Sequence, residues 1–390
     1  MKRNRFIHIV SALSVVAVSL SGALSCSDED SAAETRTVEV VRAKKPFKVF
    51  GFDGQCRYSY CPSAVLNEDG SVHLFFCGNP EQHIMVDNIY HIVLDRNGNY
   101  SSVSDVLQPG ASGSWDDHHT CDPSIVQGEF LWDNETYKYA MFFLSNRYGV
   151  YYNEVGVAFS NDLDSSSWRK WPDQIVRKTW SEDGDQAIGG TGKSWGVGQP
   201  SAVSLDRKGK VLLTYTVGDM DGTRVVWQEI DMSDLSNMQS GPVNTMCRTG
   251  LKNIDGNQDV TCNCDFAVNL EENKIVVIRP VNSNVADYPT YIPVASEIDY
   301  MDFSSFKAGT GQWTELFRID KQYSGCPRNH NAALERDSFG HISDWKNPSF
   351  YYTVSKSSPD VAPEQGRHAE WTYHIWKGSV YHTEVEVPVK

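Results

Sequence analysis

The sequence has no dense block of lysine and arginine. Of its 390 residues, 35 are Lys or Arg and 50 are Asp or Glu, which gives a formal net charge of −15. Lys2, Arg3 and Arg5 lie before residue 25 and no acidic residue does, so the rest of the chain carries about −18. Nucleic acids and anionic surfaces are not expected as partners, because the electrostatic term would oppose contact. A neutral ligand is expected instead.

Long apolar runs and helical periodicity are also missing. The apolar stretch 7–24 is interrupted by serines and is short for a membrane span. No segment keeps the apolar period of a helix for more than about two turns. Hydrophobic residues nevertheless make up 40% of the chain, which is enough for a large core. The core is therefore expected to be built from strands.

A short phrase recurs through the sequence, in which a small or acidic residue precedes an apolar, strand-forming run. Its copies lie at 61–65, 121–126, 199–203, 264–268 and, more weakly, 330–334. With Cys61, Asp122, Gln199, Asp265 and Asn331 taken as equivalent, the spacings are 61, 77, 66 and 66 residues. A β-rich segment follows each copy, at 72–77, 137–144, 211–217, 274–278 and 349–354.

Such a period indicates a repeat architecture with one sheet per repeat. We predict an all-β, five-bladed β-propeller, with four-stranded antiparallel blades around a central tunnel. Residues 46–51 are expected to form a strand that closes the last blade. The predicted organisation is a leader at 1–25, a flexible tether at 26–45 and one propeller domain at 46–390.

The leader has a positive start, an apolar middle and small residues before Cys26. It resembles a bacterial lipoprotein signal, in which the cysteine is lipidated. The acidic cluster 28–30 resembles the surface-export signal of Bacteroidetes lipoproteins. The resemblance implies an outer-membrane protein that faces the cell exterior and touches the membrane only through its lipid. An ordinary cleaved signal and an inner-leaflet anchor are the alternatives.

Eight cysteines remain beyond Cys26, and an even number in an exported chain permits disulfides without specifying their pairing. Cys262 and Cys264 are too close together for a usual zinc knuckle, and no matching pair lies elsewhere. Buried thiols or one or two disulfides are therefore favoured over a metal site.

The second repeat carries the most specific succession of motifs. It contains Asp122-Pro123-Ser124, a tyrosine-rich strand at 137–144, a Gly-x-Ala-x-Ser strand at 156–160 and a tryptophan strand at 168–172. This succession resembles the five-bladed propellers of glycoside hydrolase families 43 and 32. The resemblance implies hydrolysis of glycosidic bonds by carboxylates that meet at the tunnel mouth, with no cofactor required.

Glycoside hydrolysis needs one carboxyl group as acid and another as base or nucleophile. Asp122 and Asp265 are the predicted converging pair, and Asp53 is the predicted third carboxylate. Asp116 or Asp117 could also reach over from the preceding loop. The ring departs from the family pattern at Cys61 and Gln199, where the resembled enzymes carry acids. The alternative for both Asp122 and Asp265 is a carboxylate that caps a strand start.

The tunnel rim and the dense polar stretch 113–122 supply the predicted sugar-binding residues. They are Trp115, Asp117, His119, Trp195, Gln199, Arg328 and Asn331. Tryptophan faces suit sugar rings, although a tryptophan in an all-β protein more often packs in the core. His330 is the expected ligand of a structural calcium ion in the tunnel, and a neutral histidine bonded to the ring is the alternative. Glu297 and Asp299 alternate on one strand and are expected at a solvated edge.

Two functions follow. The first is a surface-anchored, monomeric hydrolase of neutral oligo- or polysaccharides. The second is a glycan-binding lipoprotein that has kept the propeller and lost the acids, as Cys61 and Gln199 suggest. A polysaccharide lyase is disfavoured because the negative chain would repel a polyanionic substrate.

Overall fold

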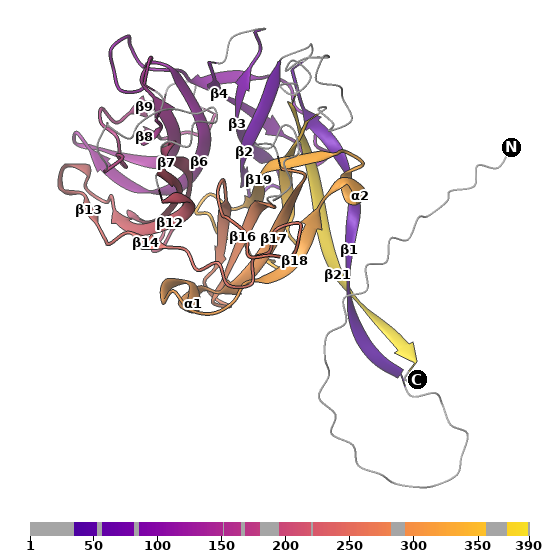
Figure 1. Cartoon of the computed structure of the whole chain (residues 1–390). Coiled ribbons are helices and arrows are strands. Elements are labelled where there is room, and N and C mark those ends of the chain that lie inside the picture. The colour runs from indigo at the N-terminus through magenta and orange to yellow at the C-terminus, as the bar shows by residue number, and fades with distance from the viewer. Residues whose placement is uncertain are drawn as a thin grey trace, which may run out of the picture. The chain divides into compact units, whose positions relative to one another are not determined.

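The computed structural model describes residues 35–52, 57–81, 86–150, 152–164, 168–179, 195–219, 221–281, 293–355 and 373–388. Residues 40–383 form one compact unit, and the described outer ends, 35–39 and 384–388, belong to a second, small unit. The larger unit is built almost wholly from antiparallel sheets arranged around a common centre (Figure 1). Among the described residues, no helix has the length and apolar character needed to cross a membrane.

The sheets are five blades, as the repeat predicts. Blade 1 is β2 (Tyr58–Leu66), β3 (Val72–Asn79), β4 (Asn88–Leu94) and β5 (Ser104–Leu107); blade 2 is β6 (His119–Trp132), β7 (Glu135–Asn146), β8 (Glu154–Ser160) and β9 (Arg169–Lys170); blade 3 is β10 (Gly196–Ser204), β11 (Lys210–Asp219), β12 (Gly222–Asp231), β13 (Gln239–Ser240) and β14 (Asn244–Thr245); blade 4 is β15 (Asp265–Asn269), β16 (Lys274–Val281), β17 (Ala295–Asp302) and β18 (Thr314–Ile319); blade 5 is β19 (Arg328–Arg336), β20 (Ser349–Ser355), β21 (Tyr373–Pro388) and β1 (Thr35–Phe50). The helices α1 (Phe303–Lys307) and α2 (Lys321–Ser324) are short, in keeping with the missing helical period.

The last blade is completed by the N-terminal strand, as expected. β1 pairs with β21, and β19 of the same blade makes a short parallel contact with β2 of blade 1. β1 begins at Thr35 rather than near residue 46. Residues 35–45 are rich in threonine and valine, whose branched side chains favour extended strands, so this part of the expected tether is ordered β-structure.

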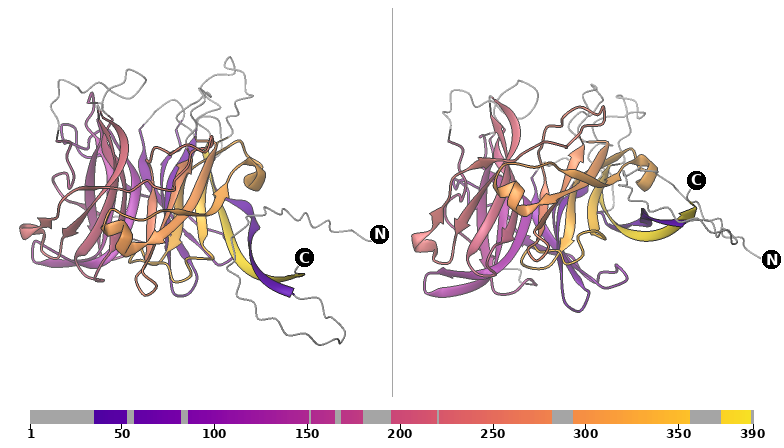
Figure 2. Two further views of the ribbon diagram at one scale, coloured as in Figure 1. Left: turned by 60° about the horizontal axis from the view of Figure 1, so that its bottom comes forward. Right: turned by 90° about the horizontal axis from the view of Figure 1, so that it is seen from below.

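Hydrophobic clusters fill the spaces between neighbouring blades. Phe142 and Leu213 belong to a cluster shared by blades 2 and 3, and Phe266 and Trp227 to one shared by blades 3 and 4. Figure 2 draws the ribbons of the larger unit from two further sides, with strands of different blades standing side by side. The strands β3, β7, β11, β16 and β20 coincide with the five β-rich segments of the repeat.

The recurring phrase forms a bulge at the start of four blades, where the register with the second strand shifts. One non-glycine residue at or just before every copy has a positive φ. These residues are Cys61, Asp122, Gln199, Asn263 and Asn331. The fourth member is therefore Asn263, and the predicted equivalence of Asp265 is wrong. Asparagine tolerates this backbone conformation well, and Asp265 lies two residues further along, in the position of Ser201.

In blades 2, 3 and 4 the residue two places after the positive-φ residue binds the next blade. Ser124 Oγ accepts the backbone N–H of Ala202 at 2.9 Å, and Ser201 Oγ accepts that of Phe266 at 3.0 Å. Asp265 Oδ2 continues the series by accepting the N–H of Leu334 at 2.9 Å. The phrase thus links successive blades by the same hydrogen bond.

Arg336 crosses this inner layer. Its side chain is almost fully buried, and its Nη2 donates to Ser124 Oγ at 3.0 Å. Its Nη1 donates to Ser201 Oγ at 3.3 Å and to the carbonyl of Phe266, and lies 3.4 Å from Asp265 Oδ1. One guanidinium from blade 5 therefore bonds blades 2, 3 and 4.

We expect Arg336→Ala to lower the free energy of unfolding by about 3–5 kcal/mol, because it leaves the Asp265 carboxylate without its buried cation. Arg177→Ala is the control, since that side chain is 58% exposed in its ion pair with Asp173 and should change stability by less than about 0.5 kcal/mol. Denaturant titration of the two variants and the wild type measures both. Equal losses in the two variants would contradict the role of Arg336.

Candidate active site

The five positive-φ residues converge on a pocket at the propeller axis. Its lining includes Cys61, Asp122, Gln199, Asn263 and Asn331, together with the residue that follows each of them and Asp265. The ring of positive-φ residues holds one carboxyl group, one thiol and three amides. The pocket measures about 20 Å³, room for roughly one water molecule. A sugar ring would therefore sit above the ring of side chains and not within it.

Asp122 is the single carboxyl group of this ring. It is only 8% exposed, and its backbone N–H lies 2.8 Å from Cys77 Sγ. Burial raises the pKa of Asp122 to about 6, and the negative charge of Asp87 adds to that rise. A hydrogen bond from Cys61 and the charge of His119 act in the opposite direction. Asp122 can therefore exchange a proton near neutral pH.

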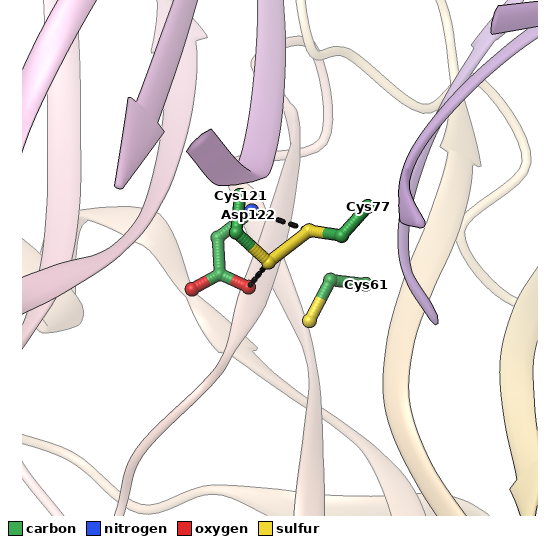
Figure 3. Close-up of side chains that lie close together, drawn as sticks. All are labelled: Cys61, Cys77, Cys121 and Asp122. Carbon is green, nitrogen blue, oxygen red and sulfur yellow. Dashed lines mark hydrogen bonds between the residues drawn. A yellow bond between two sulfur atoms is a disulfide. The ribbon is translucent and has the colours of Figure 1, made fainter. Parts of the chain in front are cut away.

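A disulfide and a thiol stand beside Asp122 (Figure 3). Cys77 on β3 is bonded to Cys121 on β6, which links blades 1 and 2 covalently next to the ring. Burial raises the pKa of the Cys61 thiol well above its usual value, so Cys61 stays protonated. Asn331 Nδ2 donates to Cys61 Sγ at 2.9 Å. One disulfide among the described residues agrees with the cysteine prediction.

A second buried carboxylate, Asp87, lies close by, and sequence reasoning missed it. Asp87 is 4% exposed and accepts hydrogen bonds from the hydroxyls of Tyr58 at 2.7 Å and Tyr60 at 2.8 Å. His119 Nδ1 lies 3.6 Å from Asp87 Oδ2. Asp87 stands just before β4, outside the recurring phrase, so no pattern in the sequence marks it.

The two carboxylates are connected by short steps. Tyr60 Oη lies 2.8 Å from Asp87 and 3.2 Å from Cys121 Sγ, which lies 3.4 Å from Asp122 Oδ1. Laid end to end, these steps bring oxygen atoms of the two carboxyl groups no farther apart than the upper end of the ~6.5–9.5 Å separation in inverting glycosidases. Asp87 is thus a close neighbour of Asp122 beside the ring.

Asp265 does not join them on the ring. Its Oδ1 accepts the Ser201 hydroxyl at 2.7 Å, its Oδ2 accepts the Leu334 N–H, and Arg336 lies against it. Both oxygens are engaged in holding blades together, so the structure places Asp265 among the contacts between blades. The predicted third carboxylate, Asp53, lies outside the described residues, as does Cys26.

The predicted sugar-binding residues divide into two groups. Trp195 packs against a cluster that contains Cys61, the disulfide and Leu144, and therefore lies near the ring. Gln199 accepts the Asn263 N–H at 2.9 Å and, like Asn331, lines the pocket, while His119 lies beside Asp87.

The other group is engaged in packing and loop structure. The ring of Trp115 stacks on Phe143 with centroids 6.0 Å apart, and Gly156 leaves room for it, since a Cβ there would come within 2.7 Å of the indole. Asp117 accepts the backbone N–H groups of Gly113 and Tyr148, both at 2.6 Å. Arg328 is 1% exposed. These three residues therefore shape the surroundings of the site.

The surroundings of His330 do not fit a calcium ion. The imidazole is 2% exposed, its Nδ1 faces the side-chain oxygen of Asn331, and its ring meets the edge of Tyr373. Burial lowers the pKa of His330 to about 4, and the positive charge of Arg328 lowers it further. Calcium needs six to eight oxygen ligands, and no carboxylate joins His330 in a ligand cluster among the described residues. The geometry is that of the alternative, a neutral histidine bonded to the ring.

Glu297 and Asp299 are buried, and the expectation of a solvated edge is wrong. Arg279 is fully buried and donates to Asp259 at 2.6 Å, to Glu297 at 2.6 Å and to Asp299 at 2.9 Å. β18 pairs with the strand that carries the two acids, so that strand is not an edge of the sheet, and acids buried there need an internal cation. This cluster holds blade 4 together.

Comparison with known proteins places the fold. No family model matches the sequence, and no curated protein matches it. A family 117 glycoside hydrolase from the marine bacterium Zobellia galactanivorans has a similar structure, with a TM-score of 0.55 and 10% identity over 87% of this chain and 90% of that one. The catalytic domain of a family 62 α-L-arabinofuranosidase from Coprinopsis cinerea matches with a TM-score of 0.54 and 10% identity, over 86% and 96% of the two chains.

An α-L-arabinofuranosidase from Lactobacillus brevis matches with a TM-score of 0.53 and 10% identity over 83% of this chain and 90% of that one. At this identity the likeness concerns the fold. The chain shares the all-β propeller architecture of these glycoside hydrolases, in line with the predicted resemblance.

The raised pKa of Asp122 predicts a pH-dependent stability. A folded pKa of about 6 against 3.8 for the ordinary group favours the protonated folded state, so this contribution is complete below about pH 4 and is lost as pH rises through 6. Between pH 4 and 7 the wild type should lose about 2 kcal/mol of unfolding free energy relative to Asp122→Asn. Denaturant titrations across this range test it, with Asp133→Asn, at an exposed acid, as the control. A constant difference between wild type and Asp122→Asn would refute the raised pKa.

Proposed function

We propose that the protein is a glycoside hydrolase that cleaves neutral oligo- or polysaccharides at the tunnel mouth. The observation that carries the proposal is Asp122, a buried carboxyl group on the axis whose pKa of about 6 suits a general acid. Asp122 donates its proton to the glycosidic oxygen. Its poor hydration and the nearby charge of Asp87 keep that proton available near neutral pH.

The base in this proposal is the pair formed by His119 and Asp87. His119 Nδ1 faces the buried Asp87 carboxylate, which would hold the ring in one orientation and stabilise the imidazolium formed when His119 takes a proton from the attacking water. The side chain of His119 is 19% exposed, so water reaches it.

The rim of the site supports a neutral sugar as substrate. Trp195 lies near the ring of side chains and offers an aromatic face, while Gln199 and Asn331 add amide groups that hydrogen-bond hydroxyls. The strongly negative chain disfavours acidic glycans. Since two of the similar structures are named α-L-arabinofuranosidases, arabinose-containing glycans are the first substrates to test.

A glycan-binding protein without catalysis is the second candidate. Four of the five ring positions carry a thiol or an amide, and the carboxylate of Asp265 is bound by neighbouring blades. A sugar could be held at such a rim without being cleaved. This candidate predicts that the same sugars bind, so only a measurement of cleavage distinguishes it from the hydrolase.

The experiment measures binding and reducing-sugar release together on arabinan, arabinoxylan and other neutral plant and algal oligosaccharides. For the hydrolase, Asp122→Asn should lower kcat by about 10²–10⁴-fold while the oligosaccharide still binds. Asp133→Asn, an acid-to-amide change at an exposed hairpin, should keep wild-type turnover. Binding with no release by the wild type would establish the glycan-binding protein.

We also propose that the protein is anchored in the outer membrane by a lipid on Cys26 and faces the cell exterior as a monomer. The small residues before Cys26 and the acids after it support this location. Cys26→Ser should move the protein from the membrane fraction to the soluble fraction, and external protease should remove the wild type from intact cells. A variant that stays in the membrane fraction would count against lipidation at this residue.

A further inference from the structure

A group of metal-binding side chains lies between blades 1 and 2, away from the tunnel mouth. It consists of His73 on β3, His91 on β4 and Asp164 in the segment after β8. His73 pairs in register with Val93 and Phe75 with His91, so both histidines lie on the same face of blade 1. Phe75 on that face packs with Ile125 and Trp168 of blade 2. The histidines therefore face the neighbouring blade.

The donor atoms are close enough to share one ion. His73 Nδ1 lies 3.0 Å from His91 Nε2 and 3.5 Å from Asp164 Oδ1. In a tetrahedral zinc site with bonds of ~2.0–2.1 Å, two ligand atoms lie about 3.3 Å apart. The two observed distances fall on either side of that value, so an ion could enter with small side-chain movements.

The donors are held in place and acids lie near them. His73 and His91 are 7% and 4% exposed, so their rings are held in place by packing. The negative charges of Asp164, Asp162 and Asp69 all act on the His73 ring, which places three acids around one imidazole. The Asp164 side chain is 63% exposed and leaves a route from solvent to the donors.

We propose that His73, His91 and Asp164 form a binding site for a zinc-like divalent cation that bridges blades 1 and 2. Two imidazoles and one carboxylate are a donor set that zinc uses in proteins, with water in the fourth position. The Cys77–Cys121 disulfide joins the same two blades near the end of β3, whereas His73 lies near its start. The ion would add a second cross-link at the other end of the blade pair.

The test uses the full chain without an affinity tag, stripped with EDTA and titrated with zinc chloride by calorimetry. The wild type should bind one zinc at this site, and zinc should raise its unfolding midpoint. His73→Gln and His91→Gln should each weaken binding by at least about 100-fold, since loss of outer-shell partners alone costs about 10–100-fold. Asp164→Asn, at an exposed position, should weaken it without disturbing the fold. His382→Gln is the matched control and should bind zinc like the wild type.

The absorption spectrum of bound cobalt distinguishes this site from the free cysteines, because thiolates also bind zinc. Cobalt bound here should show visible bands of tetrahedral geometry without the near-ultraviolet band of a cobalt–thiolate bond. Absence of zinc binding by the wild type would overturn the proposal. So would unchanged affinity in the Asp164→Asn and histidine variants, or a thiolate band that persists in them.

Discussion

The left-handed backbone at five non-glycine positions is the constraint on which the propeller depends. Each such residue costs on the order of 1–3 kcal/mol, and each interrupts the ladder between the first two strands or stands at the start of its blade. At each interruption the positive-φ residue lines the pocket on the axis. The residue two places later, such as Ser124, contacts the neighbouring blade. The same local distortion therefore creates both the pocket and the contacts that hold the pocket together.

Buried charge is distributed unequally among the carboxylates of the inner layer. Asp265 has Arg336 as its partner, and Asp299 has Arg279. Asp122 has a thiol, a partly exposed histidine and another acid near it. An arginine opposes the effect of burial on the pKa of a carboxyl group, as Arg279 does for Asp299, and it also fixes that group in place by hydrogen bonds. Asp265 and Asp299 are thus bound in contacts that hold the blades, whereas the pKa of Asp122 is raised by burial beside a thiol and a histidine.

The fold could be predicted because its determinants are local. The second strand of every blade is a run of branched and aromatic residues, and the phrase before it repeats at similar spacing.

The candidate site could be predicted less well from the sequence. The apolar run after Asp265 made Asp265 the predicted ring residue of the fourth repeat. The residue with the positive φ that marks the ring is Asn263. Asp87 meets Tyr58 and His119 only after blades 1 and 2 have packed, and Glu297 is recognisable as buried only once Arg279 is seen opposite it. Contacts of this kind leave no period in the sequence.

The pairing of β1 with β21 has a consequence for how the protein matures. Blades 1 to 4 are each contiguous in the chain, so each can form as soon as its residues have been made. Blade 5 takes strands from both ends, and its contact with blade 1 has to wait for the last of them. Until then the edges of β2 and β1 lack their partners, and an unpaired edge invites association with other chains. Chaperones that shield exposed strand edges would therefore matter most for the first strand of the chain.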